Sequence, residues 1–61
     1  MTDAARLAWL GLEVILPSGR IGTVVGLEAG GPRLLVQWAD EAGKRLGYFH
    51  EEEVKVIQVM A

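Results

Sequence analysis

The chain has 61 residues, no cysteine and a net charge of −2, from six Lys and Arg against eight Asp and Glu. This length allows one domain, residues 1–61, and the absence of thiols excludes disulfides and thiolate–metal sites. Hydrophobic residues make up 51% of the chain and charged residues 23%, so we expect a folded domain that is stabilised by dense packing or by association with another chain.

The first predicted element is a short helix over residues 3–10. Thr2 or Asp3 can cap the free amides of its first turn, the residues that follow are good helix formers, and Gly11 is a natural stop. A helix of this length is not stable alone in water, so it must dock on the remaining fold or on a neighbouring chain. We assign residues 1–11 to this helical segment.

From residue 12 onwards the pattern is that of short strands separated by turns. Gly, Pro and Asp mark turns at 17–20, 29–32 and 40–44. We therefore expect strands at 13–16, 21–28, 33–39, 45–50 and 54–59, with one helical turn at 51–53. Strands at a spacing near ten residues predict an all-β fold, and a helical turn before the fifth strand is the arrangement of an SH3-like barrel. The prediction is a five-stranded antiparallel SH3-like barrel over residues 12–59 with a short N-terminal helix.

The second predicted strand alternates between two faces. Ile21, Thr23 and Val25 alternate with Gly22, Val24 and Gly26. Glycines within a strand indicate a bulge, a bend or a close approach of two backbones. In the third strand Trp38 is expected in the core.

The last predicted strand has two apolar faces. Val54 and Val56 share one face, while Ile57 and Val59 share the other with Lys55. Because one face of a small barrel normally meets water, the second face is covered either by the N-terminal helix or by another subunit. This pattern favours self-association.

Short motifs in all five strands resemble a known group of folds. They are Val14-Ile15-Leu16, Gly22-Thr23-Val24-Val25, Leu35-Val36-Gln37-Trp38, Phe49-His50 and Glu53-Val54. These segments resemble the SH3-like barrels of small accessory subunits such as the photosystem I peripheral subunit. Their glycine-centred second strand is similar to that of KOW-type domains and of the RNA-polymerase-binding domain of the CarD family. The basic loops of KOW domains are missing here.

Catalytic and metal sites are not expected. The single serine, Ser18, occupies a turn where serine is common for local reasons, and the single histidine is His50. The side chains of His50–Glu53 are adjacent in sequence and point in different directions, so few of them could reach one ion. We predict no catalytic residue, metal, cofactor or small-molecule substrate.

Five residues are candidates for binding. The first and third loops of a five-strand meander lie at the same end, so their cations can form a patch with an aromatic side chain nearby, as in barrels that bind nucleic acid. Asp40 and Glu41 would neutralise part of this patch. Trp9, on the marginal helix, is a candidate for insertion into a partner. The candidate binding residues are Trp9, Arg20, Lys44, Arg45 and Tyr48.

These observations predict a non-catalytic protein-binding or accessory module that self-associates. The alternative is a KOW-like nucleic-acid-binding or transcription- or translation-associated module that uses Arg20, Arg33, Lys44 and Arg45. No apolar run approaches the roughly 18 residues that a membrane helix needs, and the first residues lack a secretory pattern. A cytoplasmic location and no membrane partner are the expectation.

Overall fold

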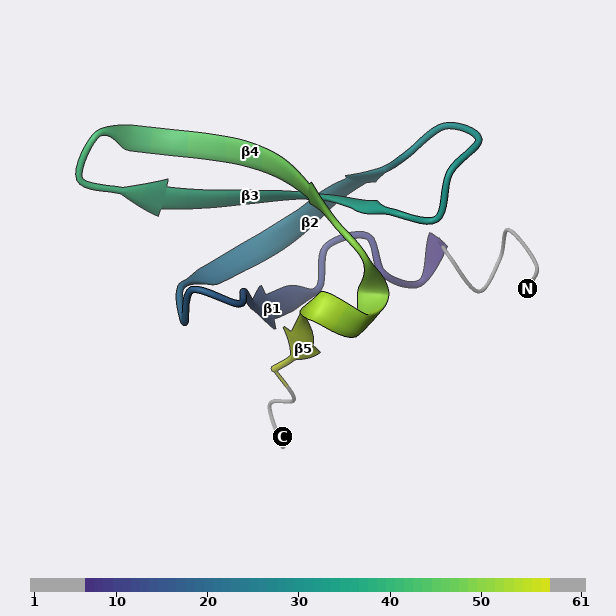
Figure 1. Ribbon diagram of the computed structural model, residues 1–61, viewed down its shortest axis with the longest axis horizontal. Coiled ribbons are helices and arrows are strands. Elements are labelled where there is room, and N and C mark those ends of the chain that lie inside the picture. Colours follow the sequence, from purple (N-terminus) through teal and green to yellow (C-terminus); the bar gives the residue numbers. More distant parts are fainter. Residues whose placement is uncertain (1–6, 58–61) are drawn as a thin grey trace.

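A computed structural model describes residues 7–57, which form one antiparallel sheet of five strands (Figure 1). The strands pair in the order β4-β3-β2-β1-β5. The prediction of an all-β fold with five antiparallel strands and a helical turn before the last is correct. The elements are β1 (Glu13–Ile15), β2 (Ile21–Leu27), β3 (Leu34–Asp40), β4 (Gly43–Phe49), the 3₁₀ turn η1 (Glu51–Glu53) and β5 (Lys55–Val56).

The sheet is not closed, so the SH3-like barrel predicted over residues 12–59 is wrong. β4 and β5 are the two edges of the sheet and do not pair with each other. β5 has two residues in the described part of the chain, which offers few backbone groups for closing a barrel. Residues 58–59 of the predicted last strand lie outside the described residues. The β3–β4 hairpin extends away from η1 and β5 (Figure 1).

The N-terminal helix predicted over residues 3–10 is also wrong, because the elements of residues 7–57 include no α-helix. Residues 3–6 lie outside the described residues. Further on, Leu10 N donates to Leu7 O and Leu12 N donates to Trp9 O, both at 3.1 Å, and these are turn bonds. Gly11 has a φ of +83°, and its N–H donates to the carbonyl of Val24 in β2 at 2.8 Å. Residues 8–11 therefore form a turn that leads into the sheet, where the prediction had placed the end of the helix.

The hydrophobic core lies on one face of the sheet, which we call the inner face. Partly buried Trp9, Leu27, Trp38 and Phe49 pack against it. The rings of Trp38 and Phe49 meet edge to face, with centroids 5.7 Å apart and an interplanar angle of 71°. The fully packed core is small and aliphatic; it consists of Val14, Leu16, Val24, Leu34, Val36 and Val54.

Two glycines let bulky groups fit the inner face. Gly22 is buried beside Val36, and the Trp38 ring lies across Gly47, where an added Cβ would be 3.0 Å from Trp38 Cη2. Further along β2, the pairing with β3 shifts register between Val24 and Gly26. Of the alternatives that these glycines indicated, a bulge, a bend or a close backbone approach, the structure shows a close approach at Gly22 and a register shift beside Gly26.

Candidate binding surface on the outer face of the sheet

The face of the sheet opposite the core carries exposed apolar side chains. Residues directly opposed across antiparallel strands share a face, so the register assigns each side chain. Ile15 pairs with Ile21, Gln37 with Leu46, and Leu35 with Tyr48. Ile15, Leu35 and Gln37 alternate with core residues along their strands, and Ile21, Leu46 and Tyr48 alternate with the inner-face glycines Gly22 and Gly47. We call this side the outer face; its most exposed apolar residues are Ile15 (38%), Ile21 (58%), Val25 (46%), Leu46 (61%) and Tyr48 (48%).

This apolar outer face follows from how the inner face is packed. The inner positions of β2 and β4 include Gly22 and Gly47, which leave room for Val36 and for the Trp38 ring. With the inner face filled in this way, Ile21 and Leu46 have to point outward. The alternation of the second strand separates Ile21 from Gly22 and Val24, yet the pattern alone does not say which face the core occupies.

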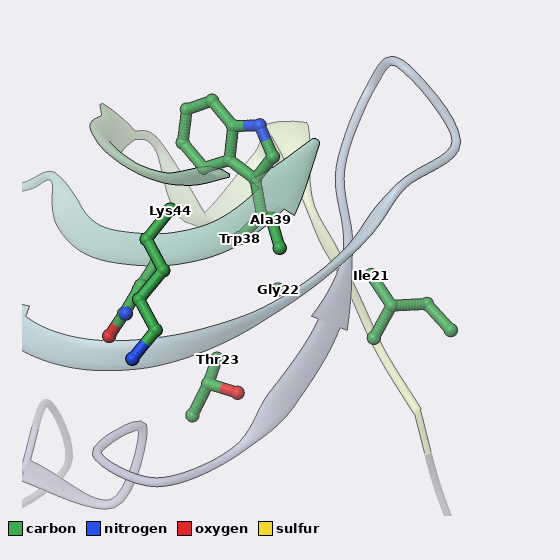
Figure 2. A pocket seen from close by; sticks show the side chains of 7 residues that line it. Ile21, Gly22, Thr23, Trp38, Ala39 and Lys44 are labelled. Atoms are coloured by element: carbon green, nitrogen blue, oxygen red, sulfur yellow. The ribbon is translucent and has the colours of Figure 1, made fainter. Parts of the chain in front are cut away.

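A shallow hollow lies on the outer face, across β2, β3 and the start of β4. Thr23 and Ala39 have short side chains and leave space between Ile21 and Lys44. Lys44 extends along the same side of the sheet as Thr23, whereas the Trp38 ring points away from them (Figure 2). The hollow has a volume of about 330 Å³ and is lined by Ile21, Gly22, Thr23, Gln37, Trp38, Ala39 and Lys44. Lys44 is the one charged residue among these lining residues.

Arg20 and Arg45 lie at the end of the sheet where the β3–β4 turn is located. Asp40 Oδ2 accepts a hydrogen bond from Arg45 Nε at 2.9 Å, and Asp40 Oδ1 accepts one from the backbone N–H of Ala42 at 2.8 Å. The pKa of Asp40 is lowered, first by the Ala42 N–H, then by the Arg45 side chain and more weakly by the charge of Arg20. The expected cation patch is therefore partly neutralised by Asp40.

Tyr48 lies apart from that patch, on the far side of Leu46 along β4. Tyr48 is four residues further along the strand than Lys44, a distance of about 13 Å at 3.3 Å per residue. Instead the guanidinium of Arg33 lies over the Tyr48 ring, with Arg33 Cζ 5.1 Å from the ring centroid. Arg33 is ion-paired with Glu28, and its Nε donates to Glu28 Oε2 at 2.9 Å. Hydrogen bonding from the Arg33 side chain lowers the pKa of Glu28.

The two tryptophans are not on the outer face. Trp9 is half-buried and packs against the core cluster, and Trp38 packs against Phe49 on the inner face. Trp38 is the register partner of Arg45, so these two residues share the inner face, whereas Lys44 lies on the outer face. Of the five candidate binding residues, Arg20, Lys44 and Arg45 lie at one end of the sheet, Tyr48 lies near Arg33, and Trp9 lies against the core.

The residues considered for catalysis or metal binding form local turn contacts. Ser18 Oγ is 3.5 Å from the backbone N of Arg20 in the β1–β2 turn. The backbone N–H of His50 donates to Glu53 Oε1 at 2.9 Å, and this bond closes η1. Within residues 7–57 there is no group of three or more His, Asp or Glu side chains that could hold a metal ion.

No relative of this chain was found among known proteins. Searches of protein families, curated proteins and solved structures find no match to the chain. No helix within residues 7–57 has the length and apolar character needed to cross a membrane.

Proposed function

We propose that this chain is a non-catalytic protein-binding module whose binding surface is the outer face of β2, β3 and β4. One observation carries the proposal: both faces of the sheet are apolar, and only the inner face is covered within residues 7–57. Ile21 and Leu46 are more than half exposed, at 58% and 61%. Clustered exposed apolar side chains with polar neighbours are typical of protein interaction sites.

The hollow narrows down the chemistry of the partner. Its lining residues include the apolar side chain of Ile21, the ammonium group of Lys44 and the small residues Gly22, Thr23 and Ala39. A partner segment that places an apolar side chain in the hollow and a carboxylate beside Lys44 satisfies both features. Short charge-assisted contacts of this kind add specificity to an apolar interface.

A nucleic-acid partner is less well supported. Two of the four cations that would meet phosphate, Arg33 and Arg45, are ion-paired with Glu28 and Asp40. The chain also carries a net charge of −2, whereas phosphate-binding domains usually have a basic excess.

The test is affinity capture from a cell lysate with three baits, each with and without nuclease treatment. The baits are the wild-type chain, Ile21→Lys on the outer face, and Ala29→Lys in the exposed β2–β3 loop as a control with the same change of charge. We expect the wild type and the Ala29→Lys control to capture the same protein after nuclease treatment, and Ile21→Lys to lose it. Capture that disappears with nuclease, or that Ile21→Lys retains, would contradict the proposal.

A further inference from the structure

The outer edge of β4 is a long strand edge without a partner in the described part of the chain. β4 spans seven residues, Gly43–Phe49, and stands at the end of the strand order. In an antiparallel pair every second residue turns its N–H and C=O away from the neighbouring strand. This edge therefore presents a row of backbone donors and acceptors, which is a template for pairing with a further strand. The opposite edge, β5, has only two residues.

β4 lacks most of the features that protect strand edges from pairing. It contains no proline, and its register with β3 is continuous from Gly43 to Phe49, so no bulge turns the edge away. Its charged residues are confined to one end. Arg45 is ion-paired with Asp40, and Lys44 extends over the sheet beside Thr23 (Figure 2). The second half of the strand, residues 46–49, is uncharged.

We propose that the partner of this edge is β4 of a second copy of the chain, paired antiparallel about a two-fold axis at Leu46. In a continuous sheet, opposed residues share a face. The two-fold axis must therefore pass between the two copies of one and the same residue of β4. Leu46 is the middle residue of the strand, and this register alone pairs all seven residues. Each Leu46 then meets Leu46 of the second copy.

The same register is chemically self-complementary. It places Lys44 opposite Tyr48, a cation beside an aromatic ring, and Arg45 opposite Gly47, so that no two cations oppose each other. Shifting the axis to Arg45 would set two arginines directly against each other, which destabilises an antiparallel pair. Shifting it to Gly47 would leave two glycines at the centre and shorten the pairing.

The dimer rests on the proposed function and extends it, because it joins two outer faces into one larger surface. The two Leu46 side chains would lie side by side at its centre, with each Tyr48 beside Lys44 of the other copy, and the exposed apolar area around Leu46 would be partly covered.

The absence of cysteine from the chain allows a direct test of the register. Opposed residues in an antiparallel pair have Cα atoms about 4.5–5.5 Å apart, within the range of a disulfide. Three single-cysteine variants are oxidised in parallel: Leu46→Cys, Arg45→Cys and, as a control of similar exposure on β2, Ile21→Cys. We expect Leu46→Cys to crosslink on the order of a hundredfold faster than Ile21→Cys, since pairing holds the thiols at an effective concentration of about 1 mM against about 10 μM for free chains. Equal rates at residues 46 and 21, or a faster reaction at residue 45, would overturn the proposal.

A second measurement uses the mass in solution. Sedimentation of the full chain over a concentration series is expected to approach twice the monomer mass of 6.6 kDa. Leu46→Lys opposes two cations at the axis and is expected to remain monomeric, while Ile21→Lys dimerises like the wild type. A wild-type monomer at every concentration, or assemblies that grow beyond a dimer, would overturn the β4 pairing. Neither result affects the proposed function, which fails separately if Ile21→Lys retains the captured protein.

Discussion

Gly22 in β2 lies against Val36 in β3 so closely that a Cβ atom on Gly22 would be 2.6 Å from Val36 Cγ1. The same Cβ would lie 3.0 Å from the backbone carbonyl oxygen of Gln37. Cβ atoms in proteins do not approach other atoms as closely as 2.6 Å. The Gln37 carbonyl belongs to the backbone of β3, so it cannot move away without disturbing the β2–β3 pairing. Val36 has no exposed surface and stands in the centre of the core.

We therefore expect Gly22→Ala to destabilise the fold by about 1–3 kcal/mol, the usual cost of overpacking a core. Gly26, in the same strand, is the matched control, because its added Cβ would meet Leu35 at an ordinary 3.5 Å. Gly26→Ala should be neutral or slightly stabilising, since alanine restricts the unfolded chain more than glycine does. Urea unfolding followed by tryptophan fluorescence measures both, and equal losses for the two variants would argue against the close contact at Gly22.

The core is so small that one aliphatic side chain should account for much of its stability. Leu34 is completely buried, whereas Leu10, in the turn before β1, is 43% exposed. We expect Leu34→Ala to cost about 2–5 kcal/mol, through the lost burial and the cavity that remains. Leu10→Ala should change the free energy of unfolding by no more than about 0.5 kcal/mol. Thermal unfolding by circular dichroism can measure both, and a Leu34→Ala variant as stable as the wild type would contradict the assigned core.

Acid should weaken the fold through two carboxylates. The pKa of Glu28 lies below its ordinary value of 4.5, first because the Arg33 side chain donates a hydrogen bond to it. The pKa of Asp40 lies below 3.8, first because of the Ala42 backbone N–H and then because of Arg45. The folded state thus binds protons less readily than the unfolded state. Its stability from these groups is present above the ordinary pKa values and is lost as the pH falls through the lowered ones.

The two sites should respond differently to loss of their arginines. Arg33→Gln removes the main cause of the Glu28 shift and should flatten the decrease in stability between about pH 5 and about pH 3. Arg45→Gln leaves the Ala42 N–H in place, so Asp40 should keep more of its acid dependence. Urea unfolding of the three proteins across this pH range is the measurement. A steeper acid dependence in Arg33→Gln than in Arg45→Gln would contradict this account.

The strands of this fold could be predicted from sequence because turn residues mark their ends locally. Pro17 to Gly19 and Gly30 to Pro32 lie in the observed connections between strands. Closure of the sheet could not be predicted in this way, because it depends on whether β4 and β5 meet in space. The helix prediction failed for a related reason: residues 8–10 form a turn in which Trp9 packs against the core, a tertiary contact that local propensity does not encode.

The candidate site was predicted in part. Antiparallel pairing brings Arg20 to the same end of the sheet as the β3–β4 turn, which follows from counting strands. The separation of Tyr48 from Lys44 depends on the register of β4, and the outward direction of Ile21 and Leu46 depends on which face the core occupies. Both are set by packing around Gly22 and Gly47, which single-sequence patterns do not resolve.

The charge at the hollow gives the final prediction, which tests the chemistry of the proposed partner. Lys44 is exposed and is the one charged residue that lines the hollow. Lys44→Glu should therefore leave folding unchanged and reduce partner binding, since the partner carboxylate would meet a like charge. We expect the affinity to fall about tenfold or more, which corresponds to at least about 1.4 kcal/mol. Lys55→Glu, on β5 and outside the hollow, makes the same charge change and should have little effect. Titration of the captured partner against the three proteins at low and high salt measures the difference. An equal loss for both variants would indicate a general effect of net charge. It would contradict the proposal that a carboxylate of the partner lies beside Lys44.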